Sequence, residues 1–219
     1  QTAQDNTSDH DADETTNTFV QMYRLLRDDK PFRHFVTVRS LLLVSSLSPP
    51  FMVTLSIQYG ADSLAGLGGF VMASGIAALI GGRLFGRMAD RSSKQLMSIG
   101  AGVASTILLL VVIAAAIPDV LGDNWFTNVM FIAAYFLLTL LHTGVRVGSK
   151  TYVVDMAEGD QRTTYVAVSN TALGIVLLVV GGISSLLATF HVLLTLIFLA
   201  VIGLVGVFAG SGLPEVSKT

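Results

Sequence analysis

Two side chains that could act inside a membrane lie four residues apart in an apolar run. His142 and Arg146 follow the segment FIAAYFLLTLL, and a spacing of four places them on one face of a helix. Histidine can carry a proton near neutral pH, and ionisable groups within membranes usually point inward and mark function. A proton or solute site is therefore one interpretation. The other is a hydrogen-bonded packing histidine beside an arginine that anchors the helix at the membrane surface.

Other polar side chains lie inside apolar segments. Adjacent Pro49 and Pro50 remove two backbone hydrogen bonds, so we expect a break near them. Broken backbone is tolerated in a bilayer only against protein or a wet cavity, and a buried asparagine must find polar partners. The sequence therefore suggests a cavity for a solute, with packing as the alternative role for each of its candidate residues, which are Ser45, Tyr135, His142, Arg146 and Asn170.

The segment GRMADRSSK, residues 86–94, places four charges between two apolar runs. Ordinary loop composition explains the arginines and the lysine. It does not explain Asp90 at the end of the apolar run, where a carboxylate can accept a hydrogen bond from the N-terminus of a neighbouring helix.

Six apolar stretches must position these residues. The chain is 52% hydrophobic and 13% charged, against about 25% charged in soluble domains. About 20 apolar residues cross a bilayer as one helix, and segments such as LLLVVIAAA lack the alternation of a β-barrel. We predict an all-α protein embedded in the lipid bilayer, with spans at about 36–57, 65–86, 96–117, 126–146, 165–187 and 192–212.

Basic residues predict the orientation. All 13 Lys and Arg flank the first span, the second-to-third connection, the fourth-to-fifth connection or the end of the sixth span. The other three connections contain none. The positive-inside rule then puts both termini in the cytoplasm and makes the chain a multi-pass protein of the cell membrane. It also puts His142 in the cytoplasmic third of its span.

The chain ends differ from the bundle, which we assign to residues 36–213. Residues 1–17 are polar and acidic and predict disorder. Residues 18–35 suggest an amphipathic helix on the membrane surface, broken by Pro31, with a solvated linker as the alternative. Residues 214–219 are predicted to form a cytoplasmic tail. The chain contains no cysteine, so it has no disulfide framework.

The second span repeats small residues at intervals of four, Ser74, Ala78, Gly82 and Gly86. Small residues at this spacing let helices approach closely. The face predicts either a sliding contact with a partner helix or static packing.

The segment at 86–94 resembles the loop motif G-x-L-A-D-R-x-G-R-K of the major facilitator superfamily. The matching positions are Gly86, Ala89, Asp90 and Arg91, while Met88 replaces Leu, Lys94 replaces Arg, Ser93 replaces the second Gly and Gln95 replaces a basic residue. The resemblance covers about residues 18–213. It implies the C-terminal half of a twelve-helix fold built from inverted three-helix repeats, with 1–35 resembling the central linker and an N-terminal six-helix bundle of the same polypeptide preceding Gln1.

The resemblance also implies a cytoplasmic latch. Asp155 and Arg162 flank a Glu-Gly-Asp turn in the fourth-to-fifth connection. With Asp90 at a helix N-terminus and Asp155 paired with Arg91 or Lys94, the latch would stabilise an outward-facing state. Its expected members are Gly86, Asp90, Arg91, Lys94, Asp155 and Arg162. The alternative is ordinary loop charge.

The leading functional prediction is a secondary transporter, or permease, of a small solute by alternating access. No G-x-S-x-G or H-E-x-x-H segment indicates an enzyme, and no feature indicates a metal, a cofactor or nucleic-acid binding. The alternative is a self-standing six-helix membrane protein that dimerises or serves as an accessory subunit. The substrate, the direction and the coupling ion are not predicted.

Overall fold

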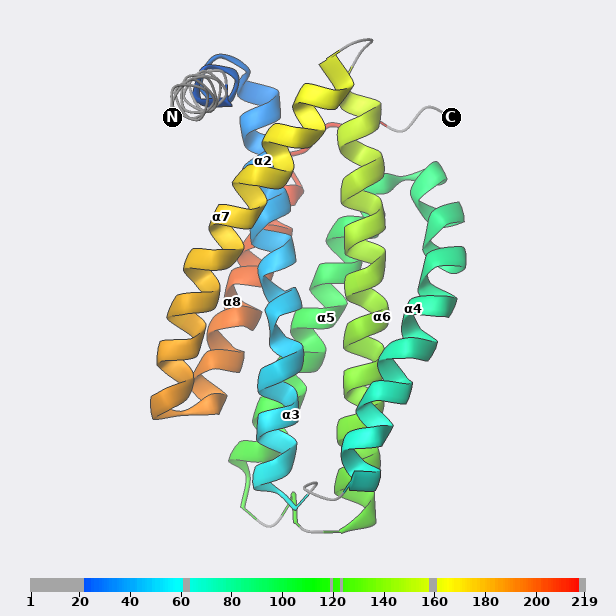
Figure 1. Cartoon of the computed structure of the whole chain (residues 1–219), viewed down its shortest axis with the longest axis vertical. Helices are drawn as coiled ribbons and strands as arrows, with labels where there is room; N and C mark the ends of the chain where they lie inside the picture. Colours follow the sequence, from blue (N-terminus) through cyan, green and yellow to red (C-terminus); the bar gives the residue numbers. More distant parts are fainter. Residues whose placement is uncertain (1–21, 61–63, 119, 123, 158–160, 217–219) are drawn as a thin grey trace, which may run out of the picture.

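The computed structural model describes residues 22–60, 64–118, 120–122, 124–157 and 161–216, and their secondary structure is helical without strands. Six helices are long and apolar enough to cross a membrane, which makes the chain a multi-pass integral membrane protein. The first crossing combines three elements and the other five are single helices (Figure 1). The elements are α2 (Lys30–Val44), η1 (Ser45–Leu47), α3 (Ser48–Gln58), α4 (Leu64–Arg91), α5 (Ser93–Ala116), α6 (Trp125–Met156), α7 (Gln161–Phe190) and α8 (Val192–Gly210).

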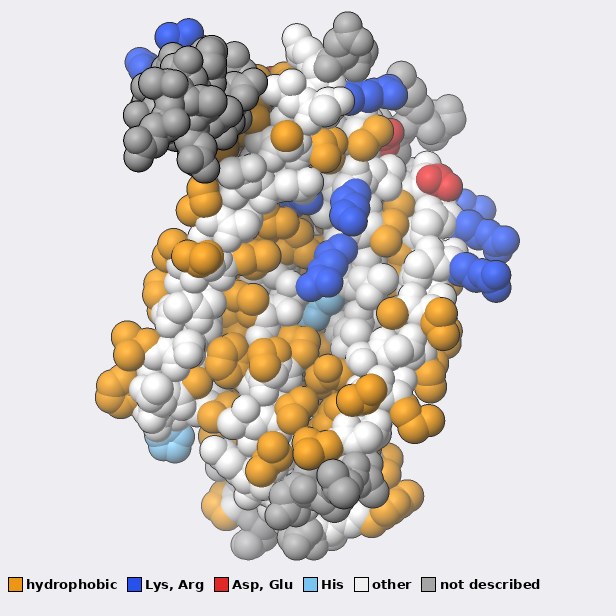
Figure 2. Space-filling view, viewed as in Figure 1, with side chains coloured by type: hydrophobic (Ala, Val, Ile, Leu, Met, Phe, Trp, Pro, Cys, Tyr) orange, Lys and Arg blue, Asp and Glu red, His pale blue; other side chains and the backbone are white. Residues whose placement is uncertain are grey.

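The helices run up and down beside one another (Figure 1). Helix α4 packs on α6, α6 on α5, and α5 on α8, which also contacts α2 and α7. Helices α4 and α7 lie at opposite edges of the view, and α2 with α3 runs between them. The start of α2 and the end of α8 lie at the same end of the bundle, and we call this the basic end, because Lys and Arg side chains gather in this half of the molecule (Figure 2).

Helix α2 starts earlier than predicted. Asp29 caps it by accepting a hydrogen bond from the Phe32 backbone N–H at 3.0 Å, and a proline lies in its first turn. Pro31 therefore begins the first span, and the predicted break at this proline was misplaced. The preceding helical residues 22–28 form a separate short segment, so the linker ends near Asp29 rather than at residue 35. Residues 1–21, with the predicted acidic tail, lie outside the described residues.

The first span breaks where the prolines require it. Pro49 and Pro50 have no N–H to donate to the carbonyls one turn earlier, and the helix tightens into the 3₁₀ turn η1 at that position. The Ser45 hydroxyl donates to the Leu42 carbonyl at 3.0 Å, and the Ser46 hydroxyl donates to the Leu43 carbonyl at 2.6 Å. The predicted break therefore takes the form of a 3₁₀ turn within a continuous helical crossing.

Three helices extend beyond the predicted spans. Helix α4 continues to Arg91, so Ser92 alone separates it from α5 and most of the segment 86–94 is helical rather than a loop. Helix α6 continues to Met156 instead of ending near 146, and α7 begins at Gln161 instead of near 165. Hydropathy detects only the part of a helix that lies in lipid, and polar residues can continue the same helix beyond it.

Helix α4 packs through a face other than its small-residue face. Helix α4 packs mainly on α6, and its buried apolar side chains are Phe70, Ala73, Ala77, Phe85 and Ala89. A Cβ built at Gly81 would lie 2.9 Å from the Thr143 side chain, whereas one built at Gly82 or Gly86 would meet nothing within 4 Å. The predicted small-residue face is therefore open within this bundle. Helix α7 is similarly uncovered, since its buried residues are Val168, Ser169 and Ser184.

Candidate functional site

A buried arginine joins the first and fifth spans. Arg39 lies on α2 and is only 2% exposed. Its Nη1 donates to the Ser169 hydroxyl at 2.5 Å and its Nη2 donates to the Asn170 Oδ1 at 2.8 Å, both on α7. Ser169 is buried, whereas Asn170 is exposed. The predicted site residue Asn170 is thus one end of a polar cluster that reaches from the surface of α7 into the bundle.

This arginine has no negatively charged partner among the described residues. Both acceptors are neutral, and the buried Nε has no hydrogen-bond partner there. The only acidic residues in the described parts of the six crossings are Asp90 and Asp155, which lie at helix ends. A buried, uncompensated charge costs several kcal/mol (about 3 to 5 when a partner is removed). Sequence reasoning treated Arg39 only as an orientation marker, although its position ten residues into α2 marks it as lying within the span.

A second polar pair lies at the break in the first span. The Ser45 hydroxyl and His142 Nε2 are 3.2 Å apart, and both side chains are buried. His142 Nδ1 is buried without a partner in the described chain. His142 lies 17 residues after Trp125 and 14 before Met156, so it occupies the middle of α6. The helix is longer than its apolar segment, so His142 lies in the middle of the helix but near the end of that segment, and its place in the cytoplasmic third of the span stays a prediction.

Basic side chains continue from His142 along the same face of α6. Arg146 and Lys150 follow at intervals of four and both are exposed. Figure 2 shows Lys and Arg side chains in a line over the middle of one face of the molecule, above a histidine. The structure therefore separates His142, which is buried, from Arg146, which is exposed, although the two share a helical face.

Tyr135 does not join this cluster. Its ring contacts Phe70 of α4 at a centroid distance of 5.0 Å in an edge-on arrangement. Both residues pack with the larger apolar cluster of the bundle. In this structure Tyr135 makes a packing contact between α6 and α4, and its cavity role stays a prediction.

The predicted latch contacts are not formed in this structure. Asp90 and Arg91 are exposed, and neither makes a hydrogen bond or ion pair with the described part of the chain. Asp155 likewise has no such contact there. Arg162 donates from Nε to the Ala157 carbonyl at 3.1 Å, and so bonds backbone just beyond the end of α6. Gly86 faces open space rather than a close helix contact.

The segment after α8 occupies the place that the latch was expected to fill. Lys94 Nζ donates to the Ser211 carbonyl at 3.2 Å and also to the Leu213 carbonyl. The Ser92 hydroxyl, which caps α5, donates to a carboxylate oxygen of Glu215 at 2.7 Å. Glu215 rather than Asp90 therefore puts a negative charge at the N-terminus of α5, where the helix dipole favours it. Nothing in the local sequence indicated this contact.

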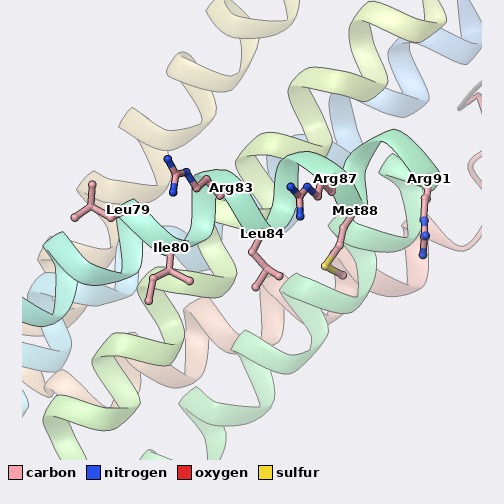
Figure 3. A pocket seen from close by; sticks show the side chains of 7 residues that line it. All are labelled: Leu79, Ile80, Arg83, Leu84, Arg87, Met88 and Arg91. Atoms are coloured by element: carbon pink, nitrogen blue, oxygen red, sulfur yellow. The ribbon is translucent and has the colours of Figure 1, made fainter.

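A basic stripe runs along the exposed side of α4. Arg83, Arg87 and Arg91 are spaced by four and share a shallow pocket with apolar neighbours on the same helix, Leu79, Ile80, Leu84 and Met88 (Figure 3). Guanidinium groups beside apolar side chains are typical of the boundary between lipid headgroups and acyl chains. This stripe marks where α4 leaves the apolar layer at the basic end.

No family model, curated protein or solved structure matches this chain. Its membership of the major facilitator superfamily therefore stays a prediction made from residues 86–94 and from the six spans.

The chemistry of the site follows from its donors. Guanidinium and imidazole groups on α2 and α6 can bind an acceptor or carry a proton. Among the described residues, no group of three or more His, Asp or Glu side chains is placed to hold a metal ion. The arrangement suits the binding of a polar solute at a break in a membrane helix.

Proposed function

We propose that this chain is one six-helix bundle of a secondary transporter that moves a small solute by alternating access. The observation that carries the proposal is the polar pair at the break in the first span, Ser45 with His142. Transporters place solute sites near discontinuous helices, since irregular backbone within a membrane is tolerated where it lines a cavity. Two buried polar side chains that meet beside this irregular turn fit such a site.

The open faces of α4 and α7 support a second bundle. The small residues of α4 permit close approach by another helix, since Ala78 and Gly82 are exposed and Ser74 and Gly86 are half-buried. Helix α7, with three buried residues in thirty, has most of its length free. A partner bundle that contacts both edges would enclose the basic face between them. By the positive-inside rule the basic end would face the cytoplasm.

Thiol labelling tests the proposal, because the chain contains no cysteine. The variant Asn170→Cys would be prepared in the full-length protein, with any native cysteine removed, and reconstituted in sealed vesicles. Alternating access predicts that a membrane-impermeant maleimide labels this thiol from either side, in complementary fractions of the molecules. The matched control is Phe208→Cys on α8, where an apolar side chain is 78% exposed and should face lipid, so this thiol should stay unlabelled.

Two results would contradict alternating access. The first is a thiol at position 170 that reacts from one side alone, and the second is one that reacts from neither. The mass of the intact protein in its native membrane decides which partner covers the open faces. A mass near 23.2 kDa would indicate a second copy of this chain, and a larger mass would indicate a longer polypeptide.

A further inference from the structure

One edge of the Arg39 guanidinium is half used. Nε and Nη2 point their N–H groups to the same side, in the two-pronged arrangement that matches two oxygens of a carboxylate or phosphate. Nη2 donates to the Asn170 Oδ1 at 2.8 Å, whereas Nε is buried without a partner among the described residues. A single neutral oxygen thus occupies an edge that can hold two charged ones.

The two described acceptors of Arg39 are neutral and supply no negative charge to this edge. The hydroxyl of Ser169 and the amide of Asn170 are the only acceptors of Arg39 in the described chain. On α6, beside α2, Arg146 and Lys150 add two exposed positive charges. Like-signed charges gathered on one face raise the local concentration of counter-ions.

We propose that the solute carries an oxyanion, a carboxylate or a phosphate, which binds the Nε and Nη2 edge of Arg39 and displaces the Asn170 amide. This inference rests on the proposed function, since it names a substrate class for the transporter and places its binding at Arg39, six residues before Ser45 along the first span. The route of entry is Asn170, which is exposed while Arg39 is not. We favour a small solute over an acidic side chain of a partner bundle, because the guanidinium is buried inside this bundle and only Asn170, of its two hydrogen-bond partners, is exposed.

The decisive variant is Asn170→Asp, which puts a carboxylate where the amide oxygen now accepts from Nη2. The full-length protein would be purified in a maltoside detergent, which has no phosphate, and its thermal unfolding followed with sodium phosphate, acetate or citrate. Glucose and choline chloride, at matched ionic strength, serve as neutral and cationic probes. We expect at least one oxyanion to raise the midpoint of the wild-type protein, and the two other probes to leave it unchanged.

The variants separate an oxyanion site from general stabilisation by salt. Asn170→Asp should unfold at a higher temperature without additive and lose the response to oxyanions. The matched control Thr171→Asp adds the same charge at the next exposed position, about 100° around the helix, and should keep the wild-type response. Arg39→Lys keeps the charge but loses the two-pronged edge, so the half-saturating concentration should rise at least about tenfold.

Each other outcome overturns the inference. One is a wild-type protein whose unfolding midpoint no oxyanion raises. This holds even if Asn170→Asp has a higher midpoint than the wild type, because Arg39 would then already bind a carboxylate of another bundle. The others are stabilisation by glucose or choline, and an equal response in Asn170→Asp and Thr171→Asp. Transport is judged separately: oxyanion binding without labelling from both sides would sink the transport proposal alone, whereas transport of a neutral solute would sink this inference alone.

Discussion

Close contact between α8 and α2 depends on glycine, and Gly206→Ala tests how much. A Cβ built at Gly206 would lie 2.9 Å from the Leu42 backbone nitrogen and 3.0 Å from the Leu41 carbonyl carbon. Since backbone cannot rotate away, the two helices must separate, and overpacking of this kind costs about 1 to 3 kcal/mol. The substitution also stabilises the helix by up to about 1 kcal/mol, because alanine has a higher helix propensity than glycine. The measured loss of unfolding free energy would therefore be smaller than the cost of the clash.

Gly102→Ala is the matched control. Gly102 lies on α5 at the contact with α8, and a Cβ there would meet its nearest neighbour, the Val207 side chain, at an ordinary 3.6 Å. Both variants gain the same helix propensity, so it cancels between them, and Gly206→Ala should be about 1 to 3 kcal/mol less stable than Gly102→Ala. The free energies of unfolding would come from SDS titration of the detergent-solubilised protein. Equal stability of the two variants would refute the close backbone approach.

Three further substitutions probe contacts that the sequence did not indicate. Lys94→Gln should release the segment after α8, lower the free energy of unfolding by about 1 kcal/mol and speed cleavage by proteinase K beyond residue 210. The control is Lys150→Gln, which changes an exposed lysine without a partner in the described chain and should not speed this cleavage. Equal cleavage of the two variants would exclude this role of Lys94. Asp29→Ala removes the cap of α2 and the acceptor of the Tyr165 hydroxyl at 2.5 Å, so thermal unfolding should show a loss of about 1 to 2 kcal/mol, against less than about 0.5 for Asp90→Ala. A large loss in Asp90→Ala would restore the latch that this structure lacks. Ser45→Ala should cost about 1 to 3 kcal/mol because His142 Nε2 loses its buried partner, and Ser46→Ala, whose hydroxyl bonds only to its own helix backbone, should cost less; equal losses in SDS titration would argue against the pair.

The helix ends show where local reasoning fails. The sequence placed the end of the fourth span at the last strongly apolar residues, yet α6 runs ten residues further, to Met156. Polar residues can continue the same helix beyond the lipid, and hydropathy records the lipid boundary rather than the helix end. His142 therefore lies in the middle of α6, although it lies near the end of the apolar segment on which the prediction rested.

The latch shows a different failure. Asp90, Arg91 and Asp155 were grouped because their types and spacing match a motif, but a motif does not fix which partner each side chain meets. Lys94 instead bonds carbonyls more than one hundred residues later, and Glu215 takes the position at the start of α5. These partners depend on where α8 ends in space.

By itself, the sequence determined the number of crossings, the gathering of basic residues at one end and the break beside Pro49. Each of these follows from a local requirement, namely the thickness of a bilayer, the cost of exposed backbone groups and the missing N–H of proline. Only the tertiary structure joined Arg39 to Ser169 and Asn170, 130 and 131 residues away, and left the small-residue face of α4 uncovered. Which polar groups meet depends on how the helices rotate and approach one another, and that is set by the packing of all six crossings together.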